Sequence, residues 1–288
     1  MRASRNWRRF VVAVASILAC QSLQNFRTEA YAADTPLISS MAQAGAAKIA
    51  LAAAPPWAFI LPSGEAQGYL VDVTGELMKA LGVGKLQPVA TTWDAMIPGL
   101  QAKQFDLIPA GLNITAARCQ VVAFSAPISV HQDGLYLTPG NPKSLTGYDS
   151  VAKSPDVKLA VLAGSSQEAY AQRRGVKADQ LIRVPDIQAG IAAVKGDRAA
   201  AFAVGQFSVT NPAQRGVELV VDKVAPLQGI GIAFRKEDAP SRDAINAQLM
   251  LLKSNGRLRE LYEKKYGFPN WDQLERTSTA TDVEPGCS

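Results

Sequence analysis

The sequence is poor in residues that bind metals or carry redox chemistry, with one histidine and three cysteines among 288 residues. It has no CxxC pair, HExxH motif or acidic calcium loop, so we expect neither a metal site nor a cofactor. Charged residues are 19% and hydrophobic residues 48% of the chain. This balance excludes a disordered, collagen-like or polytopic membrane protein and predicts a globular one of one or two domains.

No apolar run is long enough to cross a membrane as a helix, which takes roughly 20 residues. The run from Phe10 to Ala19 has only ten, and it follows four arginines. Ala30-Tyr31-Ala32 then supplies a cleavage pattern of small residues. We therefore predict that residues 1–32 are a cleavable signal peptide, that the mature chain begins at Ala33, and that the protein is periplasmic.

Two other export routes remain open. Arg8-Arg9 partly fits a twin-arginine signal, although the residues around it match poorly. A lipoprotein anchored through Cys20 is the other, although Leu18 is large at a position where a small residue is usual. Neither is favoured over a soluble mature protein.

The positive charge of the chain belongs to the predicted signal peptide. The whole chain has a net charge of +5, from 30 basic and 25 acidic residues. Removal of the five arginines and one glutamate of residues 1–32 leaves a net charge of about +1. A nucleic-acid partner is therefore not expected.

Cleavage at Ala33 would leave two cysteines, Cys119 and Cys287. An even number of cysteines in an oxidising compartment favours a disulfide, which would attach the C-terminal tail to the body of the protein. Two unrelated thiols are the alternative.

Strand and helix patterns alternate along the first half of the chain. Residues 33–47 are an alanine-rich leader without a clear prediction. After it we expect strands over residues 48–51, 86–90 and 106–109, and a helix over 71–81. A second helix is expected to begin at Thr92, because Trp93, Met96, Ile97 and Leu100 have the spacing of one buried helix face.

A second alternating set follows a turn-rich segment at residues 139–142. We expect strands over 159–162, 182–184, 200–204, 217–221 and 230–234, and helices over 167–174, 187–195, 240–254 and 257–265. The fold class is therefore α/β with two lobes, the first interrupted by the second. The expected parts are a first lobe of residues 48–137 and 232–275, a second lobe of 138–231 and a tail of 276–288. Two crossings between lobes imply a hinge and a ligand cleft.

Several local motifs resemble one protein family. They are TWDAMIPGLQA (92–102), FDLIPAG (105–111), NITAAR (113–118), VAFSAP (122–127), KLAVLAGSSQ (158–167), LLKSNG (251–256) and YEKKYG (262–267). The sequence resembles the family 3 solute-binding proteins of ABC importers over nearly all of residues 48–268. The resemblance implies a type II-like periplasmic binding fold and a monomer that carries a small carboxylate-bearing solute to a membrane permease.

One subgroup matches best. Residues 118–121 and 145–188, together with a cysteine close to the C-terminus, are similar to ectoine- and hydroxyectoine-binding members. In the family, the arginine at the position of Arg118 grips the solute carboxylate, a task that suits its planar set of donors. The resemblance also places the backbone of Gly111 and Asn113 near that carboxylate.

Serines and tryptophans complete the expected site. The resemblance implies solute contact by Ser165 and Ser166, although Ser165 could instead cap the helix that follows it. Trp57 lies where the family places an aromatic over the solute. Trp93 could join it there, or it could be a core residue. The single histidine, His131, we interpret as structural.

Three positions depart from the family pattern, and they leave the solute open. Val204 stands where amino-acid binders carry an acid for the α-ammonium, and Leu70 replaces another common acid. Asn113 stands where ectoine binders carry an aromatic. An ectoine-like or amino-acid-like solute is favoured. Another flat carboxylated solute, such as pyrroloquinoline quinone, is an alternative. A second alternative is an enzyme similar to cyclohexadienyl dehydratase. We expect no catalytic residues, however, because the matched loops supply no acid or base.

Overall fold

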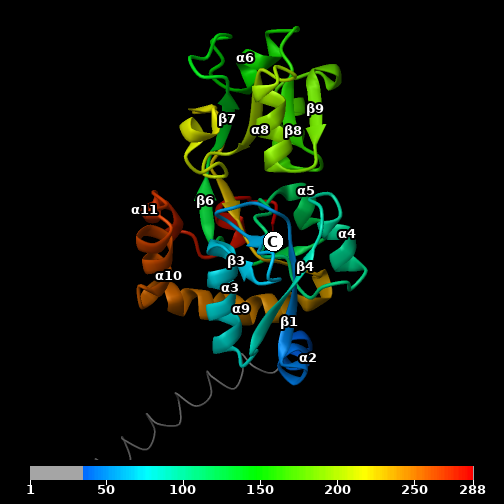
Figure 1. Cartoon of the computed structure of the whole chain (residues 1–288). Helices are drawn as coiled ribbons and strands as arrows, with labels where there is room; N and C mark the ends of the chain where they lie inside the picture. The colour runs from blue at the N-terminus through cyan, green and yellow to red at the C-terminus, as the bar shows by residue number, and fades with distance from the viewer. Residues whose placement is uncertain (1–34, 288) are drawn as a thin grey trace, which may run out of the picture.

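The computed structural model describes residues 35–287, which form two α/β lobes joined by two crossings of the chain (Figure 1). We call residues 35–128 and 231–287 lobe 1, and residues 133–227 lobe 2. The predicted signal peptide and Cys20 lie outside the described residues. The predicted two-lobe α/β fold is confirmed, with lobe 1 assembled from both ends of the described chain.

Lobe 2 is built on one five-stranded sheet. Its strand order is β11 (Glu218–Val221), β7 (Asp133–Leu137), β10 (Ala201–Gly205), β8 (Leu159–Leu162) and β9 (Leu181–Val184). Strands β10, β8 and β9 are parallel, whereas β7 is antiparallel to both of its neighbours. The parallel strands are connected through helices, which cover the faces of the sheet.

Side-chain alternation along these strands produces the two apolar faces of the lobe 2 sheet. Leu159 and Val161 point into a core that includes residues of α6 (Tyr148–Ala152) and α7 (Ser166–Arg173). Ala160 and Leu162 belong to the opposite face, together with residues of α8 (Ile187–Lys195). The second face continues into the core of lobe 1, so the two lobes share apolar packing near the crossings.

Lobe 1 has a more interrupted sheet. Its order is β4 (Lys85–Ala90), β1 (Ala46–Leu51), residues 107–108, β13 (Ala233–Phe234) and β5 (Ala123–Phe124). The expected strand over 106–109 contributes only isolated bridges to this order. Helices α3 (Tyr69–Ala80) and α9 (Ala239–Ser254) pack beside the sheet and against each other, at the lower end of the view (Figure 1).

The alanine-rich leader contains a helix that the sequence pattern missed. Helix α2 (Pro36–Ala44) buries Leu37, Ile38 and Met41 and packs against β1 and α9. Its boundaries follow ordinary rules, because Pro36 is at the first helical turn and Gly45 ends the helix with φ 69°. A short helix of this kind depends on packing for its stability, and its partner α9 is about 200 residues away along the chain.

The two crossings run side by side. Strand β6 (Ser129–His131) pairs antiparallel with β12 (Gln228–Ile230), and these two short strands connect the lobes. Since β7 belongs to the lobe 2 sheet, the first crossing lies before Asp133, earlier than the expected boundary at residue 138. The expected single strand over 230–234 is divided into β12 and β13, one in the crossing and one in lobe 1.

The remaining helices and strands complete the chain. They are β2 (Phe59–Ile60), β3 (Ala66–Gln67), α4 (Met96–Gln101), α5 (Ala116–Cys119), α10 (Arg257–Arg259), the π-helix Glu260–Lys265, α11 (Trp271–Glu275) and the 3₁₀ turns Ala178–Gln180, Pro212–Arg215, Lys236–Asp238 and Ala280–Asp282.

The prediction that a helix begins at Thr92 is wrong: Thr92 Oγ1 donates to Asp94 Oδ1, and α4 begins only at Met96. The hydroxyl is used in a local turn, and the N-cap position of α4 is Ala95, which has no side-chain cap.

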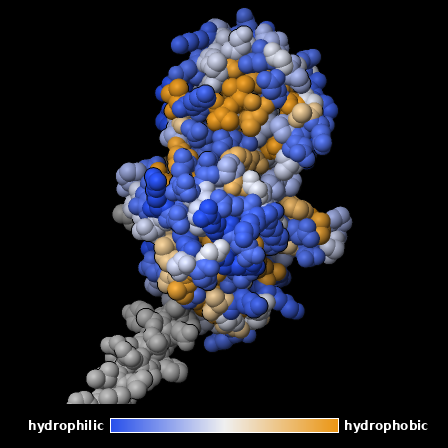
Figure 2. Space-filling view, turned by 90° about the vertical axis from the view of Figure 1, so that its left-hand side faces the viewer, coloured by the Kyte–Doolittle hydropathy of each residue, from blue (hydrophilic) through white to orange (hydrophobic). Residues whose placement is uncertain are grey.

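The surface differs between the lobes. In the view of Figure 2, lobe 1 is mostly hydrophilic and an apolar area lies over lobe 2. Among residues 35–287, no helix is both long and apolar enough to pass through a bilayer.

Candidate functional site

A cavity lies between the lobes, where about 470 Å³ is free of protein atoms, a volume that includes space open to solvent. Lobe 1, lobe 2 and the crossings all contribute to its wall, which is the arrangement expected of a small-molecule site in a two-lobe protein. The structure brings all seven sequence-predicted contact residues to this wall: Trp57, Trp93, Gly111, Asn113, Arg118, Ser165 and Ser166. Residues up to 109 positions apart in the chain therefore meet at one place.

Arg118 reaches across the cavity from lobe 1 to lobe 2. It lies on the short helix α5, whose first turn is capped by the hydroxyl of Thr115. Its guanidinium donates to the carbonyl of Asn113 at 2.9 Å and to the carbonyl of Gly164, in lobe 2, at 3.2 Å. Burial lowers the pKa of Arg118 to about 10, so the side chain is still protonated at neutral pH. A guanidinium has five N–H donors, so others remain for a carboxylate.

Asn113 connects three parts of the molecule. Its Nδ2 donates to the hydroxyl of Ser166, in lobe 2, at 2.8 Å and also to Oε1 of Gln228, on the second crossing. Close by, the backbone of Gly164 approaches Asp94 of lobe 1 so closely that a Cβ at Gly164 would lie 3.3 Å from it. The lobes are therefore in direct contact around the cavity.

The two adjacent serines have different roles. Ser165 is the N-cap of α7: its hydroxyl accepts from the backbone N–H of Glu168 at 3.1 Å. The Glu168 carboxylate in turn accepts from the backbone N–H of Gly164 at 2.9 Å. Ser166, the first residue of the helix, directs its hydroxyl toward Asn113 and the cavity. Ser165 therefore caps α7, whereas the hydroxyl of Ser166 faces the cavity and can contact a solute.

Tryptophans form the aromatic part of the wall. The ring of Trp57 is stacked on Phe268, with centroids 4.4 Å apart, and its Nε1 donates to the hydroxyl of Ser208 in lobe 2. Trp93 lies in the turn before α4 rather than inside a helix, and it is half-buried. A Cβ at Gly111 would be 3.5 Å from its ring. Both tryptophans therefore face the cavity, Trp57 from a rigid aromatic cluster.

His131 lies in the cavity wall, although the sequence alone favoured a structural role. It is on β6 with 3% of its surface exposed, and burial lowers its pKa to about 4. A Cβ at Gly205 would lie only 2.8 Å from the imidazole, so the glycine allows this close approach. The Nδ1 atom of His131 is buried without a hydrogen-bond partner among the described residues.

The depressed pKa of His131 predicts a loss of stability in acid. The unfolded chain has a histidine pKa of about 6.5, so below that pH it binds a proton that the folded protein excludes until about pH 4. Stability is therefore full above pH 6.5 and falls as the pH drops, by about 2 kcal/mol at pH 5. Urea unfolding at pH 7.5 and pH 5 should show this loss in the wild type. The His131→Gln protein lacks this titrating group, so its free energy of unfolding should fall by about 2 kcal/mol less than that of the wild type over the same pH change. An identical pH dependence in both proteins would refute the prediction.

Two glutamines at the site were missed by the sequence interpretation. Gln167 lines the cavity, and its Nε2 donates to the buried carboxylate of Asp133 at 2.7 Å. Tyr148 also donates to Asp133, whose pKa is raised by burial. Gln228 meets Asn113 and Ser166. Gln167 could have been predicted as a site residue because it directly follows the two serines in the sequence. The place of Gln228 at the site depends on the pairing of β6 with β12, which the sequence does not indicate. Within residues 35–287 no group of three metal-binding side chains occurs.

Known proteins share this fold and are similar in sequence. A hydroxyectoine complex of the protein EhuB superposes with a TM-score of 0.81 and 32% identity, covering 88% of this chain and 98% of the other. An ancestral amino-acid-binding protein, described as a precursor of cyclohexadienyl dehydratase, has a TM-score of 0.72 and 28% identity. It covers 81% of this chain and 100% of its own.

The sequence relatives are named as periplasmic binding proteins. A probable amino-acid ABC transporter periplasmic-binding protein of Sinorhizobium fredii is 31% identical over 86% of this chain and 85% of its own length. The lysine/arginine/ornithine-binding periplasmic protein of Escherichia coli is 32% identical over 71% of this chain and 81% of its own. Residues 48–268 match the model of the bacterial extracellular solute-binding proteins, family 3. The chain therefore belongs to family 3 of the bacterial extracellular solute-binding proteins.

Proposed function

We propose that this protein is the periplasmic receptor of an ABC importer, which closes its lobes over one small carboxylate-bearing solute and delivers it to the permease. The observation that carries this proposal is the position of Arg118 in the cavity, where its guanidinium contacts the backbone of both lobes. Cleft closure around such a group forms charge-assisted hydrogen bonds to a carboxylate while excluding water.

Ectoine and hydroxyectoine are the first candidates for the solute. The similarity to the hydroxyectoine complex over 88% of the chain supports them. The names of the sequence relatives support amino acids as the second candidates. A larger quinone carboxylate is not favoured, because none of these relatives is named for such a ligand.

An enzymatic role is disfavoured by the chemistry of the cavity wall. Arg118 and His131 are its titratable groups among the described residues. A general base works best with a pKa near the working pH, whereas burial lowers the pKa of His131 to about 4. Binding without turnover therefore fits the site best, in a monomer whose partners are the solute and the permease.

Calorimetric titration of the mature chain tests this function. We expect saturable binding at one site per chain for at least one of ectoine, hydroxyectoine, lysine, arginine and ornithine. Incubation with prephenate and arogenate should leave both unchanged. Absence of binding across the panel would contradict the proposal, and formation of product would assign the protein to the enzymes of this fold.

A further inference from the structure

Resting on the proposed solute-binding function, we infer that the solute presents neutral or charge-delocalised N–H groups, as in a lactam or an amidine, beside its carboxylate. A solute with a localised ammonium group, such as a free α-amino acid, is therefore not the preferred class of solute. It follows from the charges at the cavity wall and from the hydrogen-bonding atoms there that have no partner.

The described residues of the wall supply one positive charge and no negative one. Among the described residues that line the cavity, Arg118 is the charged side chain, and none is an aspartate or glutamate. Val204, at the end of β10, presents an apolar side chain with 6% exposure. An ammonium group enclosed here would lose its water without gaining a carboxylate partner, which is costly.

The nearest buried carboxylate cannot take that role. Asp133 lies behind Gln167 rather than in the cavity wall, and it is fully buried. Both of its oxygens already accept hydrogen bonds, one from Gln167 and one from Tyr148. Its contact with the solute is therefore indirect, through the orientation that it imposes on Gln167.

Two amide oxygens at the cavity are available to a solute instead. The Nε2 of Gln167 is held by Asp133, and its Oε1 accepts from the Ser166 hydroxyl at 3.3 Å, which leaves the second lone pair of this oxygen for the solute. The Nδ2 of Asn113 is used by Ser166 and Gln228, and its Oδ1 is buried without a partner among the described residues. Oxygens from opposite lobes thus accept hydrogen bonds, and being neutral they match neutral or delocalised donors.

Two further polar atoms of the wall are buried without a partner in the described chain: Nδ1 of His131 and Nε1 of Trp93. The indole N–H is a donor only, and the neutral imidazole nitrogen either donates or accepts. Leaving such atoms unpaired is unfavourable, so a solute with additional oxygen atoms gains from pairing them. The aromatic faces of Trp57 and Trp93 suit a flat ring, including one with a delocalised positive charge.

A matched pair of solutes tests the inference. L-Proline and L-pyroglutamate are both carboxylated five-membered rings, but the first carries an ammonium and the second a neutral lactam N–H. Calorimetric titration of the mature protein should give at least 10-fold tighter binding of pyroglutamate than of proline, and tighter binding of ectoine than of arginine. Equal or tighter binding of proline and arginine would overturn the inference while leaving the proposed function intact. No binding by any of the four would contradict the inference, and absence of binding across the panel above as well would contradict the proposed function.

A variant provides an independent test of the same inference. Val204→Asp adds a carboxylate to the wall, and Val204→Asn is its uncharged control of the same size. We expect the aspartate variant to bind proline at least 10-fold more tightly than the asparagine variant, and to bind pyroglutamate less tightly. Denaturant unfolding verifies that both variants fold, and the wild-type comparison stands if they do not. Equal proline affinity in two folded variants would count against the inference.

Discussion

Replacement of Arg118 by alanine should weaken solute binding by at least about 100-fold, equivalent to about 3 kcal/mol. The guanidinium is the charged group of the described cavity wall, and the variant would leave a solute carboxylate enclosed without a cation. The contact with Gly164 would also be lost, so closure of the lobes would have one hydrogen bond fewer. Calorimetric titration measures the change in affinity. The titrant is hydroxyectoine, or another solute of the panel if that solute binds the wild type more tightly.

Two variants serve as controls for the alanine protein. Arg118→Lys keeps the charge but lacks the planar arrangement of donors, so its affinity should lie between those of the wild type and the alanine variant. Arg173→Ala removes an exposed arginine that is absent from the described cavity wall, and its affinity should equal that of the wild type. Binding by Arg118→Ala within 3-fold of the wild type would refute the assigned role.

Replacement of Cys287 by serine should lower the free energy of unfolding by about 3–5 kcal/mol under oxidising conditions. The structure contains a disulfide between Cys119 and Cys287, which are separated by 168 residues in sequence. A cross-link over so long a loop restricts the unfolded chain strongly, by about 5 kcal/mol in the loop-entropy description. The stabilisation by a disulfide is commonly smaller than the loop-entropy value, and this sets the lower end of the expected range of about 3–5 kcal/mol. Denaturant unfolding of the wild type and the variant measures the difference.

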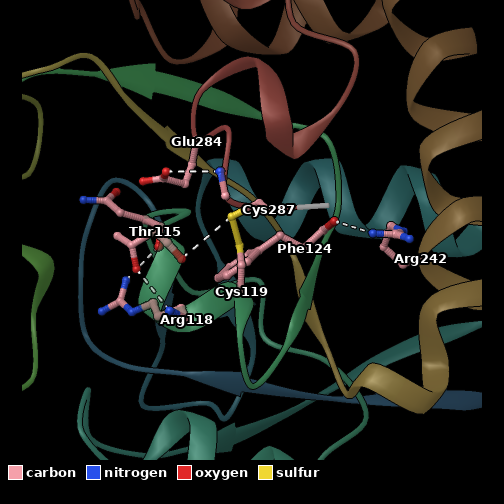
Figure 3. The surroundings of a disulfide bond; sticks show 9 residues. Thr115, Arg118, Cys119, Phe124, Arg242, Glu284 and Cys287 are labelled. Carbon is pink, nitrogen blue, oxygen red and sulfur yellow. Dashed lines mark hydrogen bonds between the residues drawn. A yellow bond between two sulfur atoms is a disulfide. The ribbon is translucent and has the colours of Figure 1, made fainter.

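Reduction of the disulfide provides the control for this variant. Wild-type protein unfolded in the presence of a thiol reductant should match Cys287→Ser, and Cys119→Ser should match both. Solute affinity should change less than 10-fold, because the guanidinium of Arg118 points away from the disulfide and is held by the carbonyls of Asn113 and Gly164 (Figure 3). Equal unfolding midpoints for oxidised wild type and variant would show that the cross-link contributes nothing.

Elements with local causes were predictable from the sequence. Helix α8 has the predicted bounds, because Asp186 caps it and apolar residues such as Ile187 and Ile191 recur at helical spacing. Strand β8 is a short apolar run that ends at Leu162, and Ser165, three residues later, is the N-cap of α7. Arg118 was found through its motif, which resembles a family, rather than through any property of an isolated arginine.

Other features depended on distant parts of the chain. Helix α2 packs against α9, which is about 200 residues away along the chain, and nothing near α2 in the sequence indicates that contact. Strand β7 is an apolar stretch that could have joined either sheet, and only its pairing with β10 and β11 assigns it to lobe 2. The boundary between the lobes was misplaced for this reason.

The motifs along the chain are enough to predict a two-lobe solute-binding protein, with an arginine, two serines and two tryptophans as its expected site. How the remaining polar groups are used depends on contacts between distant segments. The antiparallel pairing of β6 and β12 places His131 opposite Gln228, which contacts Asn113, and the hydrogen bond to buried Asp133 orients Gln167. Hydrogen bonds of this kind join residues from 34 to 115 positions apart, so no local pattern of residue types encodes them.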